Sequence, residues 1–324
     1  MTIIDLLERS IKKGKGEEQG SAAMLSSIVA CTLGPGSETE VMFRDLTGLL
    51  LATVSDNAAS LPVRSKCATA IGANCFIHGE EDIVTVSDAL LALFSGSFLK
   101  GNGALQTNLT PASIAMHASA LMSWSLLLTV QPNSAVYSLT ERYGQKISEL
   151  LESPDVDLRI AAGEAIAIMY EICQEMDDEF ELENHNSLID KLKLLATDAQ
   201  KFRAKKDRRV QRSSFRDILK SIEEGERPHV VVRFGRERLT INSWCSKRQY
   251  DALCLVLGSG MNLHLTENDL VRDIFELGSP LSGLDGSVKL SKFARHMENL
   301  AADKARTKSR GRMRDKRADV VVGI

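Results

Sequence analysis

Blocks of apolar residues, rich in Leu and Ala, alternate with polar residues through the first 200 positions and predict successive helices. Proline occurs near two of the expected first turns, at Pro62 and Pro111, where it is well tolerated. The connections are short, which favours antiparallel neighbours. We expect helices over residues 2–12, 20–33, 38–54, 62–78, 83–95, 111–130, 135–151, 155–175 and 186–200.

Two of these helices share a pattern of residues. Arg64 is followed seven residues later by Ile71, and Arg159 is followed in the same way by Ile166. A third helix carries Leu121 at the equivalent place but lacks the Arg. The three apolar positions are 50 and 45 residues apart, close to the period of about 40–47 residues of armadillo and HEAT repeats. The pattern predicts an α-solenoid over residues 1–200, an architecture that makes binding surfaces more often than active sites.

The stretch from Gly101 to Gln131 carries no formal charge and is mostly apolar after Ala112. A membrane-spanning helix needs about 20 apolar residues, but His117 and several serines interrupt this one. We therefore expect a buried helix in the middle of the helical stack.

A different unit follows residue 200. A short amphipathic helix is expected to start at Ser213 with a serine cap. Two Val- or Leu-containing runs, 229–234 and 238–241, flank Gly235-Arg236 and predict a small β-hairpin. Two further helices are expected at 243–257 and 267–277, and the glycine-rich residues 257–261 are interpreted as a helix C-terminal turn.

The last segment combines an apolar stripe with a basic run. Leu290, Phe293, Met297 and Leu300 lie on one helical face, and a helix from about 287 to 318 would be roughly 45 Å long. The predicted fold is thus mostly α: an armadillo/HEAT-like α-solenoid, then a small helical domain with a β-hairpin, and a long basic C-terminal helix. The corresponding domain boundaries are 1–200, 201–300 and 301–324.

The formal net charge of −3 hides a large asymmetry. Residues 1–200 hold 13 Lys and Arg against 27 Asp and Glu, a net charge of −14, whereas residues 201–324 hold 27 against 16, a net charge of +11. A chain divided in this way often has one end that meets a polyanion.

Two basic segments carry this excess of positive charge. The first runs from Lys201 to Arg212 and the second from Lys304 to Arg317. In the second segment, cations stand on alternate residues, so successive cations turn by about 200° around a helix and point to nearly all sides. Such a rod suits a channel walled by phosphate, although a solvated linker and a nuclear import signal are the alternatives for such runs. The predicted RNA-binding residues are Lys304, Arg306, Lys308, Arg310, Arg312, Arg314, Lys316 and Arg317 in the tail, and Lys201, Arg203, Lys205, Lys206, Arg208, Arg209 and Arg212 before the second domain.

No pattern of catalytic or metal-binding residues is found in the sequence. The six cysteines form no C-x-x-C pair and are interpreted as small buried side chains in a reducing compartment. The acidic run from Glu175 to Glu183 lacks the fixed offsets of a calcium loop and is expected to be a solvated loop between helices. We predict a protein that is not an enzyme and has no cofactor, metal site, small-molecule substrate or membrane span.

The second half of the chain resembles the C-terminal domain of the interferon-related developmental regulator family. The blocks that carry the resemblance occur in the family's order, together with Trp244, and the Ala-rich helices before them resemble its armadillo-like region. The blocks are SSFRDIL at 213–219, IEEGE at 222–226, KRQYD at 247–251, LGSGM at 257–261, HL at 264–265, IFELG at 274–278 and RDKRAD at 314–319.

The resemblance implies two family roles. The first is translational repression on the eukaryotic 80S ribosome, with the helical body in the tRNA sites and the C-terminal helix in the mRNA channel, in contact with rRNA. The second is nuclear co-regulation of transcription, with the solenoid as a scaffold for transcription co-regulators. We expect the first role, in the cytoplasm, because the alternating cations of the tail agree with it, and keep the nuclear role as the alternative.

Overall fold

The chain forms two compact units, Met1–Ser279 and Pro280–Ile324. The computed structural model describes residues 2–78, 82–104, 106, 108–197 and 205–280. The apolar stripe at 290–300 and the predicted C-terminal helix lie outside the described residues. The predicted boundaries at 200 and 300 stay predictions.

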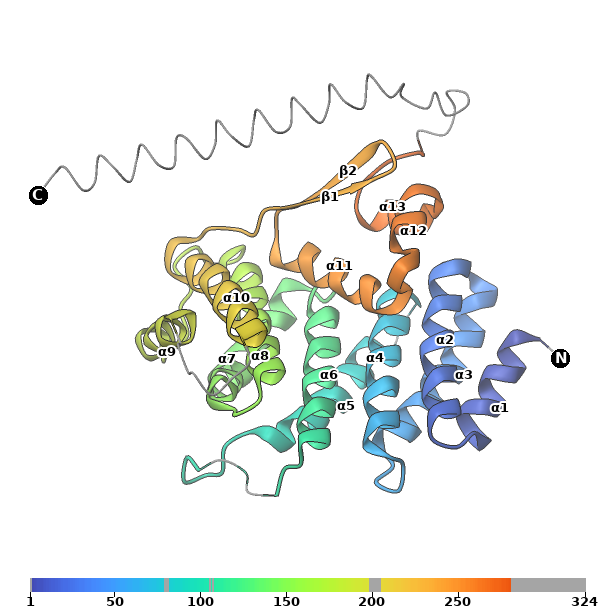
Figure 1. Ribbon diagram of the computed structural model, residues 1–324, viewed down its shortest axis with the longest axis horizontal. Helices are drawn as coiled ribbons and strands as arrows, with labels where there is room; N and C mark the ends of the chain where they lie inside the picture. The colour runs from blue at the N-terminus through green and yellow to red at the C-terminus, as the bar shows by residue number, and fades with distance from the viewer. Residues whose placement is uncertain (1, 79–81, 105, 107, 198–204, 281–324) are drawn as a thin grey trace, which may run out of the picture. The chain divides into compact units, whose positions relative to one another are not determined.

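Helices fill the first 200 positions in the predicted order (Figure 1). Every expected helix is confirmed, with ends that agree to within three residues. Their caps follow the expected chemistry: Thr110 Oγ1 accepts from the backbone N–H of Ser113, and Asp155 accepts from that of Leu158. The helices are α1 (Ile3–Lys13), α2 (Glu17–Leu33), α3 (Ser37–Ser55), α4 (Leu61–His78), α5 (Ile83–Phe94), α6 (Pro111–Leu128), α7 (Asn133–Glu149), α8 (Val156–Gln174) and α9 (His185–Thr197).

The helices stack in a solenoid-like arrangement. α2, α4, α6 and α8 each contact the next, and α3, α5 and α7 pack against α4, α6 and α8 respectively. The three register residues Ile71, Leu121 and Ile166 are all fully buried. A Cβ added to Gly72 would lie 2.5 Å from Ser123 Cβ, so α4 and α6 approach closely because this position has no side chain. The predicted mostly-α, solenoid-like fold is therefore confirmed.

The repeated arginines perform equivalent structural tasks in α4 and α8. Arg64 Nε donates to the carbonyl oxygen of Val54, and Arg159 Nη1 donates to that of Ser153. Each guanidinium thus binds backbone close to the end of the helix that precedes its own. A carbonyl group at a helix end lacks a partner within that helix, which explains why an arginine recurs at this place.

Among the described residues, one helix, α6, is apolar and long enough to cross a membrane, and 67% of it is buried inside the protein. Two of its polar side chains make hydrogen bonds inside the protein. The Nδ1 atom of His117 is 2.6 Å from Ser97 Oγ, and Ser125 donates to the carbonyl oxygen of Met122. α6 is therefore a core helix, as its serines predicted.

The region after α9 contains helices and one hairpin. The strands pair antiparallel with Arg233 opposite Arg238, and the turn at Gly235 has a φ of +52°, which favours glycine. The turn predicted at 257–261 is confirmed as a 3₁₀ turn. The elements are α10 (Lys205–Glu224), β1 (Val230–Phe234), β2 (Glu237–Ile241), α11 (Trp244–Leu257), α12 (Met261–Glu267) and α13 (Asp269–Ile274).

Two sequence predictions in this region were wrong. The helix expected to start at Ser213 begins eight residues earlier, at Lys205, because Lys and Arg are good helix formers and Gln211 is anchored by Arg159. The helix expected at 267–277 is the shorter α13, and the helix before it, α12, was not predicted. Asn268 separates them, and its Oδ1 accepts from the backbone N–H of Val271, which makes it the cap of α13.

Helix α11 lies across the solenoid and contacts α2, α4, α6 and α8 (Figure 1). Its first turn is fixed by the buried carboxylate of Glu171 on α8, which accepts from the backbone N–H groups of Trp244 and Cys245 at 2.8 and 3.0 Å. Lys247 adds an ion pair of 2.7 Å to Glu164. An acidic group at a helix N-terminus satisfies otherwise unpaired donors, so these contacts hold α11 on the solenoid.

Candidate RNA-binding surface

The predicted basic residues fall into three groups. Arg209 and Arg212 have described side chains, the first exposed and the second half-buried. Lys205, Lys206 and Arg208 lie in the first turn of α10, where the backbone alone is described. The remaining ones lie outside the described residues: Lys201, Arg203, Lys304, Arg306, Lys308, Arg310, Arg312, Arg314, Lys316 and Arg317.

One face of α10 is anchored in the body. Phe215, Ile218 and Ile222 are buried, at the spacing of a single helical stripe. The buried Gln211 continues this stripe and accepts a hydrogen bond from Arg159 Nη2. A Cβ added to Gly163 on α8 would lie 2.8 Å from Ile218 Cδ1, so α8 and α10 are in close contact. α10 is therefore fixed to the solenoid by one face.

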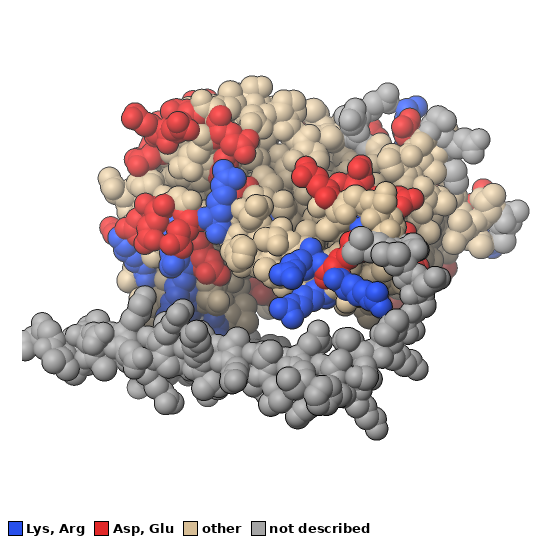
Figure 2. All heavy atoms as spheres, turned by 90° about the horizontal axis from the view of Figure 1, so that it is seen from above, with Lys and Arg blue, Asp and Glu red and all other residues tan. Residues whose placement is uncertain are grey.

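Basic side chains lie on another face of α10. Arg209, Arg212, Arg216 and Lys220 are spaced by three, four and four residues, which places them on one side of a helix. Arg209, Arg216 and Lys220 are exposed, and Lys220 forms an ion pair of 2.9 Å with Glu226. We call these four residues the α10 stripe. Figure 2 shows basic side chains gathered over α10 and again at the β1–β2 hairpin.

The α10 stripe joins two predicted residues to two that sequence reasoning missed. Arg216 and Lys220 lie beyond Ser213, where the basic segment was thought to end and a new helix to start. The error in the start of α10 hid them. Arg216 lies four residues after Arg212 and Lys220 four residues after Arg216, and this helical spacing is the signal that would have found them.

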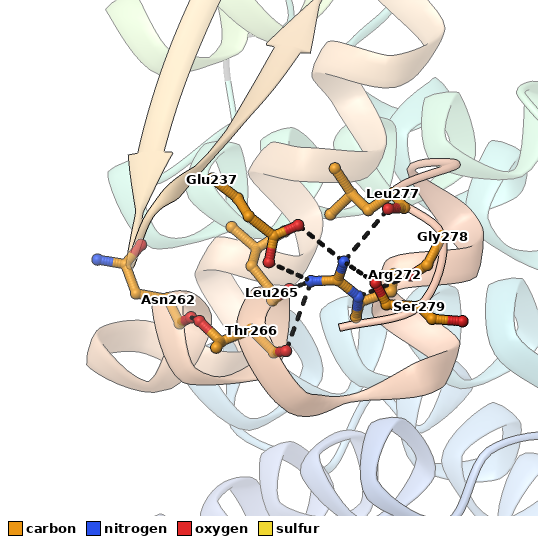
Figure 3. A network of polar contacts seen from close by, with 8 residues as sticks. All are labelled: Glu237, Asn262, Leu265, Thr266, Arg272, Leu277, Gly278 and Ser279. Atoms are coloured by element: carbon orange, nitrogen blue, oxygen red, sulfur yellow. Dashed lines mark hydrogen bonds and ion pairs between the residues drawn. The ribbon is translucent and has the colours of Figure 1, made fainter. Parts of the chain in front are cut away.

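A buried arginine anchors the hairpin to the end of the described body (Figure 3). Arg272 on α13 is 1% exposed, and its Nη1 and Nη2 atoms pair with the carboxylate of Glu237 at 3.1 and 2.8 Å. The same guanidinium donates to carbonyl oxygens of Leu265, Gly278 and Ser279 at 2.8, 2.8 and 3.2 Å. Such a bidentate pair fixes orientation as well as position. The hairpin and residues 278–279 are thus held against one another.

The comparisons with known proteins agree with the resemblance noted above. A family model described as "Interferon-related developmental regulator" matches residues 1–223, and a second, "Interferon-related protein conserved region", matches residues 268–318. The chain belongs to the interferon-related developmental regulator family. It is 44% identical to Interferon-related developmental regulator 1 of Sus scrofa over 99% of this chain and 72% of the relative. It is also 44% identical to Interferon-related developmental regulator 2 of Mus musculus, over 99% of this chain and 74% of that protein.

The family names carry no reference to catalysis. In the described part of the chain, no group of three or more His, Cys, Asp or Glu side chains could hold a metal ion. Burial raises the pKa of the Cys31 and Cys67 thiols to about 12, which disfavours their reactive thiolate forms. The acidic run from Glu175 to Glu183 forms the connection between α8 and α9, as expected.

Proposed function

We propose that the protein is a non-enzymatic translational repressor that binds the 80S ribosome in the cytoplasm. In this proposal the helical body lies in the region of the tRNA sites, and the basic segment from Lys304 to Arg317 lies in the mRNA channel against rRNA. The observation that carries the proposal is the separation of charge along the chain, −14 over residues 1–200 and +11 over the rest. Family membership supports it, since ribosome binding is one of the roles that the family resemblance implies.

The α10 stripe supports a contact between the body and phosphate. Arg209 and Arg216 project from a helix that is anchored on its opposite side, so binding a polyanion requires little reordering of the backbone. Arginine is well suited to this task because its planar guanidinium donates two parallel hydrogen bonds to phosphate. The stripe adds contacts on the body to those proposed for the tail.

The scaffold role in the nucleus is the weaker proposal. It needs an open face on the solenoid for transcription co-regulators, but α11 covers part of the face formed by α2, α4, α6 and α8. Ala252 and Val256 of α11 line one small cavity together with Met122 and Leu126 of α6. The chain's own helix therefore occupies surface that a scaffold would offer to a partner.

Co-sedimentation with purified eukaryotic ribosomes over a range of salt concentrations tests the proposal. The full chain is compared with a chain that ends at Leu300, and with a full-length variant in which the eight tail cations are Gln. Neutralisation of about eight phosphates gives a slope near −7 for log affinity against log salt. We expect both altered chains to lose most of this slope and to bind at least about tenfold more weakly.

The two altered chains separate charge from length. If the Gln variant binds like the unaltered chain while the truncated chain does not, residues 301–324 act through uncharged contacts rather than through phosphate contacts. Binding that does not change with salt, or no binding by the full chain, would falsify the proposal.

A further inference from the structure

The β1–β2 hairpin presents one face to solvent and one to the protein. Phe234, Leu239 and Ile241 are buried, whereas Arg233 and Arg238 are exposed. This alternation is that of a strand pair with one packed face. The outward face consists of Val231, Arg233, Arg238 and Thr240, with Arg236 exposed at the turn beside it.

Two cations face each other on this outward surface. Arg233 and Arg238 are direct partners in the strand register, which places their Cβ atoms about 5 Å apart. Like charges in this position destabilise a strand pair. A hairpin selected for stability alone would carry opposite charges or neutral residues here.

No acid of the hairpin compensates these cations. Glu237 is the one acidic residue between Val230 and Ile241, and its carboxylate is bound by the buried Arg272. Among the described residues, no ion pair involves Arg233, Arg236 or Arg238. Their three guanidinium groups are on exposed residues at one end of a small hairpin. Figure 2 shows basic side chains gathered in this region.

The hairpin is also held in place. Arg272 ties Glu237 to the carbonyl oxygens of residues 277–279 (Figure 3), and the buried side chains of both strands pack into the core. A two-stranded hairpin alone is marginal in water. These contacts turn it into a fixed platform for its three arginines.

We propose that Arg233, Arg236 and Arg238 form a binding site for the phosphate backbone of RNA. Guanidinium groups bind phosphate oxygens in pairs of hydrogen bonds, and a bound phosphate removes the repulsion between Arg233 and Arg238. That the RNA is ribosomal rests on the function proposed above, whereas the contact with RNA phosphate does not.

An acidic protein is the competing occupant, and the surface argues against it. Protein–protein interfaces are built around buried apolar or aromatic anchors. The outward face offers Val231 as its one apolar side chain, and no aromatic residue. Recognition here is electrostatic, which suits a regular array of phosphates.

The test measures binding of the full chain to a fluorescein-labelled RNA duplex of 20 base pairs by fluorescence anisotropy. The variant carries Arg233→Gln, Arg236→Gln and Arg238→Gln, all at exposed sites. The matched control carries Arg9→Gln, Lys13→Gln and Lys15→Gln, which remove the same charge from exposed positions in and after α1. Circular dichroism and thermal melting establish that both variants are folded.

We expect the hairpin variant to bind the duplex about 10- to 100-fold more weakly at about 0.1 M salt, and its salt slope to fall by about 3. The control variant should change affinity by less than about threefold. Equal losses in the two variants, or no loss in the hairpin variant, would overturn the proposal. Binding of poly-glutamate as tight as that of RNA would also overturn it, in favour of an acidic protein partner.

Ribosome co-sedimentation of the same variants separates this proposal from the previous one. If the full chain binds ribosomes and the hairpin variant binds them equally well, the hairpin site is wrong and the proposed function stands. If the full chain binds the RNA duplex through the hairpin but does not bind ribosomes, the proposed function fails and the RNA site stands.

Discussion

The solenoid and the region that follows it are stabilised in different ways. In the solenoid, α4, α6 and α8 pack through small and apolar residues such as Gly72, Ala120 and Ala165, and the contacts are distributed along whole helices. In α10–α13 and the hairpin, a few buried polar contacts are decisive: Arg272 makes several hydrogen bonds, and the first turn of α11 donates two to Glu171 of α8. Distributed apolar packing tolerates change at one position, whereas buried charges depend strongly on each partner.

The difference also bears on function. Since the inward-facing polar groups hold the second region together, its outward surface is free to carry uncompensated cations. The solenoid instead carries most of the acidic residues of the chain. Stability and the proposed RNA binding are thus assigned to different sides of the same small elements.

The largest effect is expected from Arg272→Ala. The substitution leaves Glu237 without its partner and several carbonyl groups without a donor, and loss of one partner of a buried ion pair costs about 3–5 kcal/mol. The chain has two tryptophans, Trp124 in the solenoid and Trp244 in α11. Urea unfolding followed by fluorescence in Trp124→Phe and Trp244→Phe backgrounds therefore reports each region separately.

We expect the unfolding free energy reported by Trp244 to fall by the full amount, about 3–5 kcal/mol. The unfolding free energy reported by Trp124 should fall by less than half as much. Equal shifts would show that the two regions unfold as one and would break the comparison. Arg238→Ala serves as the matched control, because this exposed arginine of the same hairpin should change the unfolding free energy by less than about 0.5 kcal/mol.

A second effect should be confined to the solenoid and depend on pH. Burial, with a smaller contribution from the charge of Arg64, lowers the pKa of His117 from 6.5 to about 4. The neutral imidazole is thus favoured in the folded state, and its stabilisation is complete above pH 6.5. As the pH falls from 6.5 towards 4, the unfolded chain takes up a proton that the folded chain does not, and stability falls by on the order of 3 kcal/mol.

The unfolding free energy of the Trp244→Phe background, measured from pH 7 to 4.5 with and without His117→Gln, tests this expectation. The His117→Gln variant should lose less stability than its parent over this range. Burial also lowers the pKa of His78, so part of the pH dependence should remain in the variant. Parallel curves for the two proteins would contradict the assignment to His117.

The smallest effect compares two glycines inside helices. Gly72→Ala places a methyl group 2.5 Å from Ser123 Cβ, and such overpacking costs about 1–3 kcal/mol. Gly48→Ala lies in α3, where an added Cβ meets nothing within 4 Å, and should stabilise by about 0.5–1 kcal/mol. Thermal melting of both variants measures the two changes in stability. Higher stability in both variants would show that α4 and α6 can move apart at little cost in free energy.

Much of the fold could be predicted because the helices carry local signals. Thr110 and Asp155 cap their helices, Gly235 makes the turn, and the spacing of Ile71, Leu121 and Ile166 indicated stacked repeats. The candidate surface was harder to predict. A basic run marks an excess of charge but not which cations share a face, so Arg216 and Lys220 were missed when the start of α10 was placed at Ser213.

The sequence by itself determined the order of the solenoid helices and the position of the hairpin, since these depend on neighbours within one or two helical turns. It also determined the repeat and the division of charge, because both follow from residue spacing and counts along the chain. The tertiary structure decided that α11 covers part of the solenoid, that Arg159 holds α10 through Gln211, and that Glu237 is turned inward to Arg272. Hydrogen bonds in these contacts join residues 35, 52 and 120 positions apart. Charge alone does not reveal such pairs, because an acidic side chain beside three arginines has several possible partners until packing buries one of them.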